Sequence, residues 1–125
     1  MTTQPILVID DNPTLRHAIS SYLEERGYAV RAAADGKEGL EIARRDLPAA
    51  ILADLMMPRM DGRELAARIR EDAATRHIPV IVFTATDMSE EERERSGFVA
   101  YLRKPVDPAT LMSTLEEALG AAPEA

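Results

Sequence analysis

The sequence predicts an α/β fold in which an open, parallel sheet is covered by helices on both faces. Two observations predict it. Short, continuous apolar runs alternate along the chain with segments of helical periodicity. The apolar runs lack the polar alternation of strands that face water, so both of their faces are expected to be buried. Strict alternation of strands and helices favours parallel strands with right-handed crossovers, and five strands are too few for a closed barrel of eight. A doubly wound sheet remains.

Five apolar segments are the predicted strands. Four of them are strongly apolar, whereas the second carries Arg31 between small residues and is weaker. The predicted strands cover residues 5–10, 28–33, 49–54, 79–84 and 98–103.

Five segments between and after these runs are the predicted helices. In the first, Leu15, Ile19 and Tyr22 recur at helical spacing. Asn12 before Pro13 is a favourable start, and Gly27 suits a helix end. Caps followed three residues later by glutamate are expected at Asp35, Asp61 and Ser89. The predicted helices cover residues 13–26, 36–47, 62–72, 89–96 and 108–119.

Length and composition set limits on function. The 125 residues suit a single domain over 1–125, with a core over 5–119 and a flexible tail over 120–125. The net charge of −7 disfavours nucleic acid and anionic membranes as partners. The absence of cysteine excludes disulfides, thiolate metal sites and a cysteine nucleophile. A signal peptide and a membrane-spanning run are absent, so we expect a cytoplasmic protein.

Chemically active residues follow four of the predicted strands. Asp10 and Asp11 follow the first, Asp54 ends the third, Thr84 ends the fourth and Lys104 follows the fifth. Ligands of open α/β sheets bind beyond the carboxyl ends of the strands, so these side chains are expected to converge. Carboxylates crowded in one crevice repel unless a cation joins them. A hard divalent ion, Mg²⁺ or Mn²⁺, fits such oxygen ligands, and a carboxylate beside it can attack phosphorus.

Each of these residues also has an ordinary structural interpretation. An aspartate can cap a turn, a threonine suits a strand, and a lysine can end one in solvent. The joint arrival of all of them at one sheet edge favours a site. His17 and His77 do not align with these strand ends, and we expect them to be surface or packing residues.

Four segments of the sequence resemble the receiver domains of two-component response regulators. They are residues 6–12, 54–62, 82–85 and 101–105, and the similarity extends over nearly the whole chain. The resemblance implies a flavodoxin-like (βα)5 sandwich with strand order 2-1-3-4-5. It also implies a signalling domain that accepts a phosphoryl group from a sensor histidine kinase or a histidine phosphotransfer protein. Such a domain is not an enzyme beyond promoting its own phosphorylation and dephosphorylation.

The resemblance assigns a role to each site residue. Asp10 and Asp11 would hold Mg²⁺, and Asp54 would be both phospho-acceptor and metal ligand. The backbone carbonyl of Met56 would complete the protein's share of the metal shell. Lys104 would pair with a phosphoryl oxygen, and its bond to proline is expected to be cis.

A switch is also implied. Thr84 would move to the phosphoryl group, and Tyr101 would rotate inward, changing the face formed by residues 89–96, 98–103 and 108–119. An unidentified target protein, or a second copy of the chain, would bind this face. Met56 and Thr86 would flank the path of the water molecule that attacks the phosphoryl group during dephosphorylation. Val106 stands where the family often has an aromatic residue.

Three alternatives stay open at this point. A flavodoxin-like nucleotide binder would need a phosphate cradle after the first strand, where Asp10 and Asp11 would repel phosphate. A phosphatase of the haloacid-dehalogenase type uses a similar set of residues, but its two aspartates form an Asp-x-Asp motif at the end of the first strand. A receiver that serves only as an interaction module would not need the intact acidic residues, threonine and lysine.

Overall fold

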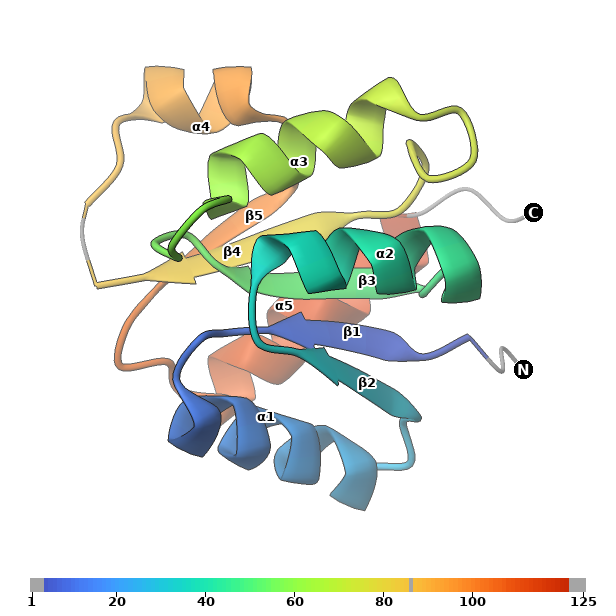
Figure 1. The fold of residues 1–125 in the computed structure, drawn as a ribbon. Coiled ribbons are helices and arrows are strands. Elements are labelled where there is room, and N and C mark those ends of the chain that lie inside the picture. Colours follow the sequence, from blue (N-terminus) through green and yellow to red (C-terminus); the bar gives the residue numbers. More distant parts are fainter. Residues whose placement is uncertain (1–3, 86, 122–125) are drawn as a thin grey trace.

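A parallel sheet of five strands forms the middle layer of the computed structural model, which describes residues 4–85 and 87–121 (Figure 1). The strands lie in the order β2-β1-β3-β4-β5, so the predicted topology is confirmed. Each pairs in parallel with its neighbours. The strands are β1 (Ile6–Ile9), β2 (Val30–Ala33), β3 (Ala50–Asp54), β4 (Val80–Thr84) and β5 (Ala100–Arg103).

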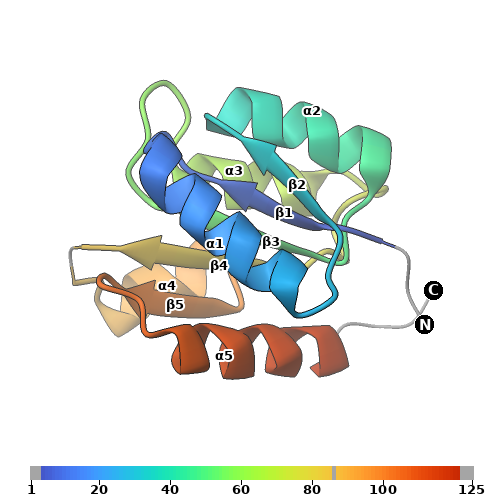
Figure 2. The same ribbon diagram turned by 90° about the horizontal axis from the view of Figure 1, so that it is seen from below.

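Helices cover both faces of this sheet, as the alternating pattern predicts. α1 and α5 lie on one face, and α2 and α3 lie on the other (Figure 2). α4 lies beside α3 (Figure 1). Within the described ranges, no helix is both long and apolar enough to span a membrane. The helices are α1 (Pro13–Glu25), α2 (Gly36–Asp46), α3 (Gly62–Glu71), α4 (Glu90–Ser96) and α5 (Pro108–Ala121).

The core has two halves because successive strand residues point to opposite faces of the sheet. Leu7 and Ile9 pack toward α2 and α3, whereas Ile6 and Val8 pack toward α1 and α5. The central strands β1, β3 and β4 are buried along their whole length, and the edge strand β2 exposes its middle residues. Continuous apolar runs therefore predicted correctly that β1, β3 and β4 are covered on both faces, whereas β5, whose segment is also strongly apolar, is only partly buried at the edge of the sheet.

The predicted helix starts are confirmed by their hydrogen bonds. The Asn12 side chain accepts from the backbone N–H groups of Thr14 and Leu15. Asp35, Asp61 and Ser89 each accept from the N–H of the residue three positions later. At the end of α1, Gly27 adopts φ +92°, a conformation that favours glycine.

Several element boundaries differ from prediction. The strand expected from residue 28 begins at Val30, because the Tyr28 N–H donates to Leu23 O and closes α1. The strand expected from residue 98 begins at Ala100, since the buried Phe98 packs into the core without pairing in the ladder. α5 continues to Ala121, two residues beyond its predicted end at residue 119. Residues 122–125 of the predicted tail lie outside the described residues.

The fold predicts opposite effects for alanine at two helical glycines. A Cβ at Gly39 in α2 would lie 2.3 Å from Cδ1 and 2.9 Å from Cγ1 of the buried Ile9. Overpacking there should make Gly39→Ala less stable by roughly 1–3 kcal/mol. At Gly120 in α5, no atom of the described residues beyond the helix's own backbone and the adjacent residues lies within 4 Å of such a Cβ, so Gly120→Ala should be neutral or slightly stabilising. Urea unfolding measures both, and equal stability of the two variants would contradict this packing.

Candidate functional site

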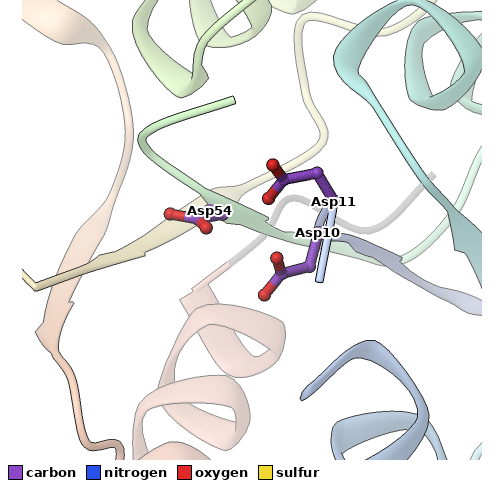
Figure 3. A group of neighbouring side chains, drawn as sticks. All are labelled: Asp10, Asp11 and Asp54. Atoms are coloured by element: carbon purple, nitrogen blue, oxygen red, sulfur yellow. The ribbon is translucent and has the colours of Figure 1, made fainter. Parts of the chain in front are cut away.

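Three carboxylates from two neighbouring strands meet at the carboxyl edge of the sheet. Asp10 and Asp11 follow β1, and Asp54 ends β3, which pairs with β1 up to Ile9 and Ala53. One oxygen of each of the three carboxylates lies within 4.8 Å of the others. Figure 3 shows the three side chains gathered at these strand ends. The predicted convergence of the acidic residues is therefore confirmed.

Asp10 is the most buried of the three and has one oxygen without a hydrogen-bond partner. Its Oδ1 accepts from the Asn12 N–H at 2.9 Å, whereas its buried Oδ2 has no hydrogen-bond partner among the described residues. Burial is the largest influence on the Asp10 pKa and raises it; the Asn12 N–H opposes this shift, and the charge of Asp54 adds to it. An ionised Asp10 therefore destabilises the folded protein until a cation compensates it.

Asp54 is held by a backbone donor and a cation. Its Oδ1 accepts from the Met56 N–H at 3.1 Å, and its Oδ2 lies 3.0 Å from Lys104 Nζ. The same ammonium lies 3.9 Å from Asp10 Oδ2 and 5.3 Å from the centre of the Phe83 ring. Lys104 is bonded to proline through a cis peptide bond, as the resemblance implied.

A divalent cation would balance the net negative charge of this cluster. Three carboxylates and one ammonium give a formal charge of −3 + 1 = −2. The donors are oxygens, and Asp10 Oδ2 is a buried acceptor that lacks a donor. Hard divalent cations such as Mg²⁺ bind through one or two carboxylates and retain several waters. The residues present fit such an ion, with Asp10, Asp11 and Asp54 as the groups that would hold it.

Two of the other predicted residues, Thr84 and Tyr101, lie on the strands expected for them. Thr84 is buried at the end of β4, and its carbonyl accepts from the Lys104 N–H at 2.8 Å. Tyr101 on β5 is partly buried against the core, with the Arg93 guanidinium 5.4 Å from its ring centre. The Met56 side chain is 59% exposed beside the cluster. The metal-ligand role of its carbonyl stays a prediction, and Thr86 lies outside the described residues.

One residue of this site was not predicted from the sequence. Arg16, in the first turns of α1, donates from Nη1 to the backbone carbonyl of Asp10 at 2.7 Å. Its signal was weak, because an arginine six residues after an aspartate indicates nothing without knowledge of how the helix begins. His17 and His77 are exposed and do not belong to the cluster.

Comparisons with known proteins agree with this geometry. The family model of the response regulator receiver domain matches residues 6–116. Protein PilH of Pseudomonas aeruginosa is 36% identical over 116 residues, which cover 91% of this chain and 96% of PilH. The chemotaxis protein CheY4 of Vibrio cholerae is 31% identical, with a TM-score of 0.87 over 94% of this chain and 99% of that one.

A third relative was solved with a metal ion. The receiver domain of the sensor histidine kinase PA1611 from Pseudomonas aeruginosa is 32% identical, with a TM-score of 0.85 over 94% of this chain and 98% of that one. Its structure has a magnesium ion coordinated in the active-site cleft. Together with the family match, these similarities decide against a nucleotide-binding flavodoxin and a phosphatase of the haloacid-dehalogenase type.

The raised pKa of Asp10 predicts that its neutralisation stabilises the metal-free protein. Asp10→Asn keeps an acceptor for the Asn12 N–H but removes the buried charge. In EDTA near neutral pH, Asp10→Asn should therefore have a higher Tm than the wild type, because it lacks the buried charge. The advantage should fade as pH falls through the raised pKa, where wild-type Asp10 takes up a proton.

The matched control is Asp11→Asn, which removes the same charge from an exposed neighbour and should change Tm less. Adding Mg²⁺ should raise the Tm of the wild type and leave Asp10→Asn nearly unchanged. A lower Tm for Asp10→Asn than for the wild type in EDTA would refute this electrostatic account.

Proposed function

The chain belongs to the response regulator receiver domain family, and on this premise we propose that it accepts a phosphoryl group from a phosphohistidine onto Asp54, with Mg²⁺ or Mn²⁺ bound. One observation carries this proposal. Asp54 is a buried carboxylate that lies beside a lysine ammonium and close to two further carboxylates at the edge of the sheet. That combination supplies a nucleophile, a cation for the transferred group and oxygen ligands for a metal ion.

The proposed step forms a bond between an Asp54 oxygen and phosphorus and breaks the bond from phosphorus to the imidazole nitrogen of the donor. The imidazole keeps the electron pair of the broken bond. The Met56 N–H and the Lys104 ammonium hold the carboxylate of Asp54 in place before the reaction. A nucleophile that is already oriented loses little freedom when it reacts.

Charge develops on the phosphoryl oxygens during transfer and needs cations around it. When bound, the metal ion would supply much of that positive charge. Lys104 would then release its contact with Asp54 Oδ2 and pair with a phosphoryl oxygen. Thr84, buried at the end of β4, would reorient its hydroxyl toward the same group.

The response would spread through the face formed by α4, β5 and α5. Movement of Thr84 would let Tyr101 rotate inward and leave its position near Arg93 of α4. α4 has no buried residue, and Glu92 on it pairs with Arg63 of α3 at 3.0 Å. A helix held by exposed contacts is cheaply displaced, because exposed ion pairs contribute little stability.

Partners follow from the same proposal. A sensor histidine kinase or histidine phosphotransfer protein would donate the phosphoryl group, and an unidentified protein or a second copy of the chain would bind the altered face. Direct binding of nucleic acid or membranes is not part of this function. The chain would act in the cytoplasm and catalyse only its own phosphorylation and dephosphorylation. Support comes from the response regulators among its relatives.

Labelling by a small phosphodonor tests the acceptor. Incubation with Mg²⁺ and a small acyl phosphate should add one phosphoryl group to the intact mass of the wild type, and Asp54→Asn should gain none. Asp61→Asn is the matched control, because Asp61 is a nearby helix cap whose role asparagine can keep. Unchanged labelling of Asp54→Asn would refute the assignment.

Amide hydrogen exchange tests the switch. On phosphorylation, exchange in α4 should accelerate, because inward movement of Tyr101 removes a contact with Arg93. Thr84→Ala should accept the phosphoryl group but show little of this acceleration, and α1 should exchange equally in all samples. Identical α4 protection before and after wild-type phosphorylation would rule out this transmission.

A further inference from the structure

A cyclic network of hydrogen bonds links Asp10, Asn12 and Arg16, in the segment that carries Asp10 and Asp11. The Asn12 N–H donates to Asp10 Oδ1 at 2.9 Å, and the Arg16 N–H donates to Asn12 O at 3.0 Å. Arg16 Nη1 then returns to the backbone carbonyl of Asp10 at 2.7 Å. The network joins the end of β1 to the first turns of α1.

This network fixes Asp10 on several sides. Its N–H donates to Ala33 O at 3.1 Å, its carbonyl accepts from Arg16, and its Oδ1 accepts from Asn12. The remaining atom, Oδ2, is buried and lies 3.9 Å from the Lys104 ammonium. Asp10 thus presents one oxygen toward the cluster with the rest of the residue held.

The Arg16 contact also bears on Asp11. Because a peptide group is planar, holding the carbonyl of Asp10 orients the whole unit that joins it to Asp11. The side chain of Asp11 is exposed, so packing does little to set its direction. Two of the three acidic residues therefore depend on a peptide group that the Arg16 guanidinium holds.

We propose that Arg16 is a positioning residue for the divalent cation, acting through the backbone of Asp10 and not as a ligand. This inference rests on the proposed function, since it concerns the same cation site. Groups that orient metal ligands typically change metal affinity by about 10–100-fold when removed. Arg16 carries a charge-assisted hydrogen bond to a partly buried carbonyl, which is among the stronger kinds.

Isothermal titration of Mg²⁺ into the metal-free protein tests the proposal. Arg16→Met should weaken the Kd for Mg²⁺ by about tenfold or more. Arg16→Lys should recover part of the affinity, because an ammonium can donate to the same carbonyl. Labelling by a small acyl phosphate should need more Mg²⁺ in Arg16→Met but reach the wild-type extent at saturation, a pattern that general loss of structure would not produce.

Arg26→Met is the matched control. Arg26 also donates from Nη1 to a backbone carbonyl, that of Tyr22 at 3.2 Å, but at the far end of α1. Arg26→Met removes the same positive charge as Arg16→Met, and it should leave the Kd for Mg²⁺ unchanged.

Two results would overturn the positioning role. The first is an affinity for Mg²⁺ equal to that of the wild type in both Arg16→Met and a second variant, Arg16→Gln. The second is loss of the native circular dichroism spectrum in both variants, which would show that the Arg16 contact is needed for folding. A wild-type protein that binds Mg²⁺ but accepts no phosphoryl group would overturn the proposed transfer instead, and the affinity ratio between variants would still be measured.

Discussion

Three carboxylates crowded at one end of the sheet repel one another, and the properties of the site follow from that repulsion. Asp10 and Asp54 are buried, yet one oxygen from each of them and one from Asp11 lie within 4.8 Å of one another. Such an arrangement costs stability unless positive charge offsets it. Lys104 offsets part of that charge, and a divalent cation would offset the remainder. The negative charge that Lys104 does not offset therefore favours the binding of a cation at this site.

The rest of the fold serves to hold that arrangement. β1 and β3 are buried along their length and pair in register, which brings Asp10 beside Asp54. The Lys104 N–H donates to the Thr84 carbonyl, and this hydrogen bond joins the segment after β5 to the end of β4. The peptide bond that follows Lys104 is cis. By contrast, α4 has no buried residue and is held by exposed contacts. The molecule therefore combines a rigid site with a weakly attached helix on the face proposed to respond.

Much of this could be predicted from the sequence, for identifiable reasons. Continuous apolar runs predicted the buried strands, and caps such as Asn12 and Asp61 predicted where helices begin. The convergence of the carboxylates followed from parallel topology alone. Strand starts at residues 28 and 98 were wrong, because apolarity reports burial and not pairing. Arg16 was missed, because its role depends on the direction of one side chain after the chain turns from β1 into α1.

Locating the bound cation in a crystal would show whether these carboxylates form a metal site. Crystals of the protein soaked in Mn²⁺, with anomalous scattering recorded at a wavelength sensitive to manganese, would place the ion without reference to any activity. We predict one strong peak among the carboxylates of Asp10, Asp11 and Asp54, at oxygen distances of roughly 2 Å. Crystals that bind Mn²⁺ elsewhere and leave this cluster without a peak would contradict the account.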